Sequence, residues 1–286
     1  MGHKNNKSMV RQVQERLEEQ LRIGQSKYAA QQAERTQHPE GIFSYSTFRT
    51  YMKHCNYFAA WAKEQHGCRT LEAARPYVDE WLLSRSGLSA STVKMEASAL
   101  AKLYGCSTSN FVETRSRHRA DITRSRGDAV RDRHFSTEKN AELINFCRCT
   151  GLRRAELEAL RPDQLRQRDD GSFALEIKGK GGRVRLAPIV GTQEQVKAVV
   201  DRVQAAEGRV WGKVHSGADI HAYRAEYATK VYEQHARPVD EIPREDAYHC
   251  RGDLKGVVYD KAAMEVASEA LGHSRISVIA GHYIRG

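Results

Sequence analysis

The sequence predicts a mainly α-helical protein with a small β-hairpin, divided into two domains. Apolar residues recur at three- and four-residue spacing along most of the chain, which is typical of amphipathic helices. Two short β-prone segments flank a glycine-rich turn at residues 178–182, which is typical of a hairpin. From residue 114 to residue 134 the apolar pattern gives way to arginine, so we expect a linker between two parts that each bury a core.

The first half of the chain is predicted to be helical throughout. Residues 10–37 are polar and rich in helix formers, so a single helix is expected there. Candidate N-caps at residues 44–47 precede a helix with an apolar face. That face carries Phe48, Tyr51, Cys55, Phe58 and Ala59. Further helices are expected over residues 73–83 and after candidate N-caps at residues 88–92, which together make a small bundle.

The second half is predicted to combine helices with the hairpin. A helix is expected from Ala141 to Cys149, and the sequence Arg161-Pro162-Asp163 should end the next one. The hairpin strands are residues 173–177 and 184–188. Further helices are expected over residues 193–206, 221–234 and 261–271. The expected segments are an N-terminal helical extension (1–42), a helical domain (43–113), a basic linker (114–134) and a second domain (135–286).

The charge balance favours a polyanionic partner. Lysine and arginine number 46 against 36 aspartate and glutamate residues, which gives a net charge of +10 and a pI near 9.3. Each phosphate that a cation neutralises releases counterions, so such a surplus strengthens binding to nucleic acid. The plain alternative for the linker is a solvated connector, but we expect it also to follow a DNA backbone. Its expected DNA contacts are Arg115, Arg117, Arg119, Arg124 and Arg126.

The cysteines and the N-terminal sequence indicate the cellular compartment in which the protein is expected. The six cysteines are scattered without a CxxC pair, which disfavours both a metal site and a disulfide framework. The start of the chain lacks the apolar segment of a signal peptide, and no stretch is apolar enough to span a bilayer. We therefore expect a DNA-associated protein of the bacterial cytoplasm, with no metal, no cofactor and no membrane partner.

Six residues of the second half carry the side chains needed to cut and rejoin DNA through a tyrosine. Arginines can hold the non-bridging oxygens of a phosphodiester, and a lysine can protonate a leaving alkoxide. Histidines can move protons, and a phenol can attack phosphorus. The set is Arg153, Lys180, His221, Arg224, His273 and Tyr283. Each member taken singly also has an ordinary interpretation as a surface residue or a core histidine, so the prediction depends on the whole set.

The local contexts of the set suit this chemistry. Glu156 follows Arg153 by one helical turn and can brace its guanidinium, although surface Arg–Glu pairs of this spacing are common. The turn that contains Lys180 is not a Walker motif, because a strand rather than a helix follows it. His221 and Arg224 are one helical turn apart, so both can reach one phosphate.

These contexts resemble those of the tyrosine recombinase (phage integrase) family. The matching pieces are TGLRRAEL, the GKGG turn, HAYRAEYA, LGHSRIS and the terminal HYI. More loosely, YSTFRTYMKHCNYFAAWAKE and LSASTVKMEASALAKLY look like the core-binding domain of the family. The resemblance implies a core-binding (SAM-like) DNA-binding domain over residues 43–113 and a mixed α/β catalytic domain over residues 135–286. Together they would form a C-shaped clamp on DNA.

The resemblance also implies a mechanism. Tyr283 would attack the scissile phosphate, forming a 3′-phosphotyrosyl link and a free 5′-hydroxyl, without ATP or metal. Arg153 and Arg224 would stabilise the transition state. Lys180 would protonate the leaving oxygen, and His221 would act as general base or proton relay. Supporting roles implied are a hydrogen bond from His273 to the phosphate, structural support from Glu156, and DNA contacts by Lys178, Arg183 and Arg275.

The partners implied are double-stranded DNA recombination sites and further copies of this chain, with a tetramer in the synaptic complex. Residues 238–260 lengthen the connection between Arg224 and His273 beyond the usual family length and look like an insertion. They contain a rival pair, His249 and Arg251, but its spacing is one residue short, so His221 and Arg224 are preferred.

The first functional expectation is an integrase or transposase that integrates and excises a mobile element. A resolvase of chromosome or plasmid dimers would use the same chemistry. A type IB topoisomerase shares the active-site logic, but the compact helical half favours recombination. The alternative from another class is a catalytically silent DNA-binding regulator, against which the intact set of six residues argues. A generic RNA-binding protein lacks support, because the sequence has no aromatic ribonucleoprotein signature.

Overall fold

The computed structural model describes residues 7–36, 39–118, 121, 135–179 and 182–284. The chain divides into two compact units, Met1–Asp121 and Ile122–Gly286. Helices dominate the first unit, and the second combines helices with two small sheets. The predicted class, mainly α with a small sheet, is therefore confirmed. Most of the basic linker, including Arg119, Arg124 and Arg126, lies outside the described residues, as does Lys180.

The first unit is a helical bundle. Ser44 and Ser89 cap α3 and α6 through their side chains, at positions where the sequence predicts caps. Pro76 divides the helix expected over residues 73–83, because proline lacks the N–H that a continuous helix requires there. The helices are α1 (Met9–Glu18), α2 (Lys27–Ala33), α3 (Tyr45–His66), α4 (Leu71–Ala74), α5 (Val78–Ser84) and α6 (Ala90–Tyr104), with 3-10 turns at Arg75–Tyr77 and Thr108–Asn110.

The single helix expected over residues 10–37 is wrong. α1 ends at Glu18, and Leu21 then forms an isolated parallel bridge with Ile42 before α2 begins. Gly24, with a φ of +84°, lies between the bridge and α2. The apolar residues of α1 share a buried cluster with α3 and α6, so this segment contributes to the core of the first unit. Those residues are Met9, Val13 and Leu17.

The larger sheet of the second unit is antiparallel, in the order β1-β2-β3. Its strands are β1 (Leu165–Gln167), β2 (Phe173–Lys178) and β3 (Val184–Pro188), so the predicted hairpin is confirmed and β1 is an addition to it. On β3 the exposed side chains are the apolar Val184 and Leu186, whereas Arg185 and Ala187 point into the protein. A strand alternates its faces, so this register places a charged side chain in the interior.

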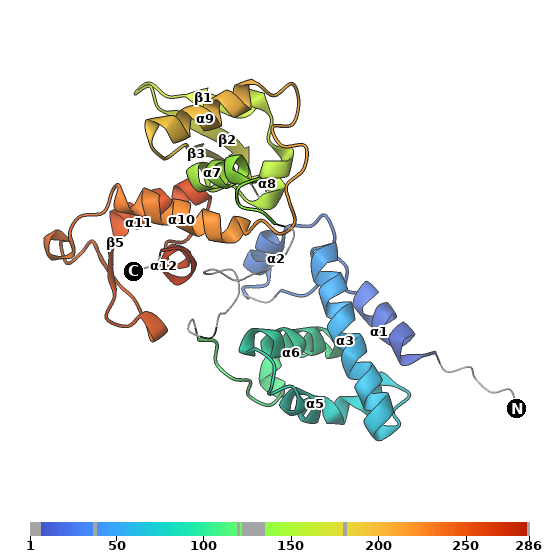
Figure 1. Ribbon diagram of the computed structural model, residues 1–286. Helices are drawn as coiled ribbons and strands as arrows, with labels where there is room; N and C mark the ends of the chain where they lie inside the picture. Colours follow the sequence, from blue (N-terminus) through green and yellow to red (C-terminus); the bar gives the residue numbers. More distant parts are fainter. Residues whose placement is uncertain (1–6, 37–38, 119–120, 122–134, 180–181, 285–286) are drawn as a thin grey trace, which may run out of the picture. The chain divides into compact units, whose positions relative to one another are not determined.

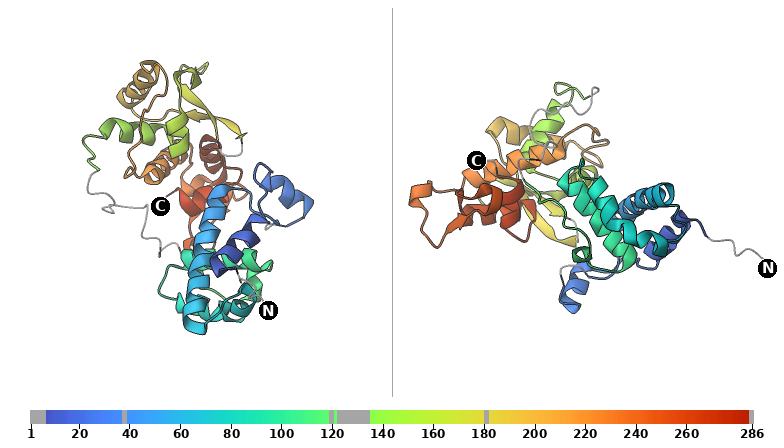
Figure 2. Two further views of the ribbon diagram at one scale, coloured as in Figure 1. Left: turned by 90° about the vertical axis from the view of Figure 1, so that its right-hand side faces the viewer. Right: turned by 90° about the horizontal axis from the view of Figure 1, so that it is seen from below.

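The second unit has two hydrophobic clusters, and α10 contributes to both. Ile220 and Tyr223 belong to the cluster of the larger sheet, whereas Tyr227 and Val231 belong to the cluster around α11 and α12. α10 accordingly lies between α7 on one side and α11 on the other (Figure 1, Figure 2). The remaining elements are α7 (Ala141–Thr150), α8 (Arg154–Ala159), α9 (Gln193–Gln204), α10 (Ile220–Glu233), β4 (Ala247–His249), β5 (Val258–Asp260), α11 (Lys261–Leu271) and α12 (Ser277–His282), with 3-10 turns at Pro162–Gln164, Val239–Glu241 and Gly252–Leu254.

Residues 238–260, which the sequence suggests are an insertion, contain the antiparallel pair β4–β5. Arg237 anchors the base of this segment through hydrogen bonds of 2.6 and 2.8 Å to the carboxylate of Asp260. The same Asp260 carboxylate caps α11 by accepting from the backbone of Ala262 at 3.0 Å. No helix in the described part of the chain has the length and apolar character needed to cross a membrane.

Candidate active site

Arg153 enters the site from the start of α8. It occupies the N-cap position, and Glu156 of the first turn accepts from its backbone N–H and from its guanidinium, both at 2.8 Å. The carboxylate thus contacts Arg153 as the spacing of the two residues suggests. The side chain of Arg153 remains 32% exposed, so its guanidinium can still receive a ligand.

Arg224 is buried on α10, with 2% of its surface exposed. Its guanidinium donates to the backbone carbonyls of Gly151 and Leu271, which lie at the C-terminal ends of α7 and α11. Helix C-termini carry partial negative charge, which helps to compensate for burial of the cation. Burial and the charge of Arg153 lower the pKa of Arg224 to about 10, so it is still cationic at neutral pH. Its Nε atom is buried without a hydrogen-bond partner among the described residues.

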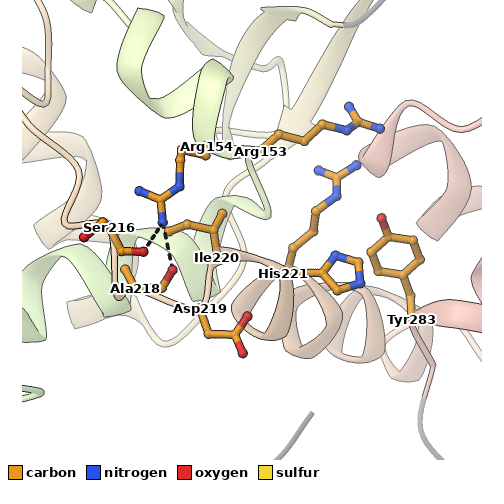
Figure 3. Close-up of a pocket in the computed structure, with 9 residues that line it drawn as sticks. Arg153, Arg154, Ser216, Ala218, Asp219, Ile220, His221 and Tyr283 are labelled. Atoms are coloured by element: carbon orange, nitrogen blue, oxygen red, sulfur yellow. Dashed lines mark hydrogen bonds between the residues drawn. The ribbon is translucent and has the colours of Figure 1, made fainter. Parts of the chain in front are cut away.

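Tyr283 directly follows α12 and is 7% exposed. Its ring lies edge-on to His221, at 5.4 Å between centroids, and tilted against His273 at 5.2 Å. The guanidinium carbon of Arg224 lies 5.7 Å from the centroid of the same ring. Figure 3 shows the imidazole of His221 beside the phenol ring.

His273 follows the left-handed residue Gly272 that ends α11. Burial, followed by the charges of Arg224 and Arg153, lowers the pKa of His273 to about 4. The imidazole is therefore neutral at physiological pH. Its Nε2 atom is buried, and no described residue forms a hydrogen bond with it. A buried polar atom without a partner is costly, so a ligand that supplied one would be favoured.

Four of these side chains, those of Arg153, His221, Arg224 and Tyr283, line a pocket of about 390 Å³. Arg154 shapes one wall, because its guanidinium turns away from Tyr283 and donates to the backbone of residues 214–218 (Figure 3). Two of those bonds, to Ala218 and His215, are 2.9 and 3.0 Å long. The residues that line the pocket are Arg153, Arg154, Ser216, Ala218, Asp219, Ile220, His221, Arg224 and Tyr283.

The structure thus brings five of the six predicted catalytic residues together, and the sixth, Lys180, is outside the described residues. His249 lies on β4, and neither it nor Arg251 lines the pocket. Among the candidate DNA contacts, Arg115 donates to the carbonyl of Leu88 at 2.6 Å in this structure. Arg115 is exposed, and so are the other described candidates: Arg117, Lys178, Arg183 and Arg275.

Two residues that shape the site are not predicted from the sequence. Arg154 looks like a surface residue beside Arg153, yet it holds the pocket wall. Arg185 stands in a basic hairpin, yet it is buried against Glu156. The signal for Arg185 is the two-residue period of β3, which puts its side chain on the same face as Ala187. Among the described residues, no group of three or more His, Cys, Asp or Glu side chains could hold a metal ion.

Comparison with protein-family profiles and with curated protein sequences gives no match. Comparison with solved structures does give matches. The post-cleavage complex of the XerH site-specific recombinase with a palindromic difH substrate is 15% identical, covers 97% of this chain and 91% of its own, and has a TM-score of 0.53. The Tn1549 transposon integrase with transposon right-end DNA is 11% identical over 98% of this chain and 96% of its own, with a TM-score of 0.45 that supports no conclusion by itself.

The chain has the fold of the tyrosine recombinases, the fold that the sequence resemblance implies. At 15% identity this likeness concerns the architecture, and the chemistry depends on the residues of the pocket.

Proposed function

We propose that this protein is a site-specific DNA recombinase that cleaves and rejoins DNA through a covalent link to Tyr283. The observation that carries the proposal is the surroundings of that phenol. Two imidazoles and the buried guanidinium of Arg224 lie against its ring, and Arg153 lines the same pocket. A tyrosine that served only the core would not need a cationic pocket that can bind phosphate.

In the proposed reaction, the Oη atom of Tyr283 attacks the scissile phosphorus. The bond from phosphorus to the 5′-oxygen breaks, leaving a 3′-phosphotyrosyl link and a 5′-hydroxyl. His221 accepts the phenolic proton, directly or through water, and Lys180 supplies a proton to the leaving oxygen. An incoming 5′-hydroxyl reverses the steps on a new partner strand, so the energy of the broken bond is kept in the link.

Two fixed cations stabilise the charge that develops on the phosphoryl oxygens. Arg224 is held by two backbone carbonyls and Arg153 by Glu156, so neither has to reorganise during the reaction. The neutral imidazole of His273 offers its buried Nε2 atom to a phosphoryl oxygen. The donor must then be the Nε2–H tautomer, which a bound phosphate would select.

The proposal extends to assembly and biological role. The helical unit and the catalytic unit would each contact DNA, the arginine-rich linker would follow the backbone, and four copies would join two sites. The integration and excision of a mobile element is our first expectation for the role. Resolution of chromosome or plasmid dimers is the alternative, and the DNA site distinguishes the two.

A suicide-substrate assay tests the proposal. DNA that the protein selects from a random pool is nicked near the selected site, so that cleavage releases a short strand and traps the covalent complex. The wild type should form an adduct that survives denaturation, and Tyr283→Phe should form none. Tyr223→Phe, on α10 outside the pocket, is the matched control and should form the adduct.

Two other results would contradict the proposal. An adduct that survives Tyr283→Phe would show that another residue is the nucleophile. Tight and selective DNA binding without an adduct from any of the three proteins would indicate the silent regulator instead.

A further inference from the structure

Arg185 is a charged residue in the interior of the second unit. Its side chain is 5% exposed, in a strand whose outward neighbours Val184 and Leu186 are apolar. Burying a guanidinium is unfavourable unless its donors are satisfied, so this arrangement needs compensating contacts. Arg185 does not line the pocket, so its side chain would not contact a phosphate bound there.

One end of the Arg185 guanidinium is bound to the carboxylate that holds Arg153. Nη1 and Nη2 of Arg185 donate to the two oxygens of Glu156 at 3.0 and 2.8 Å. The same two oxygens accept from the side chain and the backbone of Arg153. Glu156 is therefore clamped between the two arginines, and its orientation depends on Arg185 as much as on Arg153.

The Nε atom of Arg185 reaches the end of α11. It donates to the carbonyl of Ala270 at 3.0 Å. A Cβ atom placed on Gly272 would lie 2.8 Å from Cδ of Arg185, so the side chain packs directly against the turn that leads to His273. The carbonyl between these two positions, that of Leu271, accepts from Arg224.

Arg185 also contributes charge to the site. Arg153 and Arg185 share the single carboxylate of Glu156, and the charges of both are, after burial, among the causes of the lowered pKa of Arg224. The charge of Arg185 is one of the causes of the lowered pKa of His273, after burial and the charges of Arg224 and Arg153.

We propose that Arg185 is a positioning residue of the active site. Without touching DNA, it sets the orientation of Arg153 through Glu156 and fixes the end of α11 that leads to His273. This inference depends on the proposed recombinase function, because the two residues that it positions act on the scissile phosphate. It assigns to β3 a role in catalysis in addition to carrying the hairpin.

The test compares Arg185→Gln, Arg185→Lys and a control, Arg166→Gln. Arg166 forms an ion pair with Glu176 in the same sheet, but both side chains are more than 40% exposed. Three quantities are measured for each protein: the Kd for nicked DNA, the rate of adduct formation at saturating DNA, and the pKa of His273 from an NMR titration of the free protein. The His273 signal is assigned with a His273→Asn variant.

We expect Arg185→Gln to bind DNA within about threefold of the wild type and to cleave about 100-fold more slowly, because small displacements of catalytic groups have effects of that size. Arg185→Lys should recover part of the rate, since one ammonium can still bind Glu156. The pKa of His273 should rise in Arg185→Gln, which lacks the cation, and stay low in Arg185→Lys and in the control.

Two outcomes would overturn the inference. One is a cleavage rate that is unchanged in Arg185→Gln. Another is a loss of DNA binding as large as the loss of rate in both variants, which would indicate general disruption. If Arg185→Gln does not fold, the same comparison is made with Arg185→Lys. A cleavage rate equal to that of the wild type, or a loss of DNA binding as large as the loss of rate, would then overturn the inference. If the wild type forms no adduct, the recombinase proposal is wrong. The NMR titration then still tests Arg185: an unchanged His273 pKa in Arg185→Gln would show that Arg185 does not act on the site.

Discussion

At the scale of single residues, the site is organised by where its charges are buried. Arg224 donates to carbonyls at the ends of two helices and is fixed before any substrate arrives. The carboxylate of Glu156 binds both Arg153 and Arg185. Such preorganised charge is the main means by which enzymes stabilise a developing oxyanion. The same charges also contribute to stability, and this contribution depends on pH.

Glu156→Gln should destabilise the second unit and remove part of its pH dependence. Burial raises the pKa of Glu156, but the hydrogen bonds from Arg185 and Arg153 outweigh it, so the pKa falls from 4.5 to about 2. Because the folded-state pKa is the lower one, the stabilisation is complete above pH 4.5 and is lost as the pH falls toward 2. Its full size is on the order of 3 kcal/mol.

Denaturant unfolding of the wild type and Glu156→Gln between pH 7 and pH 3 tests this. The difference in unfolding free energy should be largest at pH 7 and should shrink below pH 4.5. Glu176→Gln breaks an exposed ion pair in the same sheet and should change stability by less than about 1 kcal/mol. A gap between wild type and Glu156→Gln that stays constant over this pH range would refute the explanation.

Sequence reasoning finds residue contacts that are local and misses those that are not. Glu156 and Arg153 are three positions apart on a helix, so their contact follows from helix geometry. Arg185 and Glu156 are 29 positions apart, and their contact requires the register of β3 to be known. The two-residue period of β3 can assign Arg185 to the inner face, but it does not identify Glu156 as the partner there.

At the scale of elements, the backbone before Arg153 is shaped by a close approach of α7 to α10. Gly151 ends α7 with a φ of +59°, and a Cβ atom there would lie 2.2 Å from Cδ1 of Tyr227. Two constraints thus act on one residue, a left-handed backbone and contact with an aromatic ring. The turn places Leu152 in the core and directs Arg153 to the pocket.

Gly151→Ala should lower stability by about 3 kcal/mol or more, because it combines backbone strain with overpacking. Gly171→Ala is the matched control in the same unit, with a φ of +79° and no atom within 4 Å of the added Cβ. The control should lose about 1 kcal/mol, from backbone strain alone. Thermal unfolding measures both, and equal losses would show that contact with Tyr227 does not matter.

The elements themselves follow from the sequence where the local signals are strong. Caps at Ser44 and Ser89 and the hairpin around residues 178–182 are correctly placed. The break between α1 and α2 is missed because it depends on the pairing of Leu21 with Ile42, a contact that helix propensity does not reveal. β1 is missed because three residues carry too little periodicity to detect.

At the scale of the whole molecule, the dominant property is the net charge of +10. Binding to DNA should weaken steeply with salt, because each neutralised phosphate contributes a slope of about −0.9 to the plot of log K against log salt concentration. Linker arginines that follow the DNA backbone contribute to this slope. The double variant Arg124→Gln and Arg126→Gln should then reduce the slope by about 2 units, one for each lost contact.

Fluorescence anisotropy at several salt concentrations measures the slopes. The control is Arg11→Gln, because Arg11 is already paired with Glu15 on α1 and should leave the slope unchanged. A double variant with the wild-type slope would show that the linker is a solvated connector.

The sharing of α10 between two hydrophobic clusters has a consequence for folding cooperativity. Neither cluster can open without exposing part of this helix, so local unfolding on one side weakens the other. Amides of the larger sheet and of α11 should therefore exchange with solvent at similar free energies, as one foldon. Because His221 and Arg224 lie on the shared helix, the proposed active site should persist until the whole second unit unfolds.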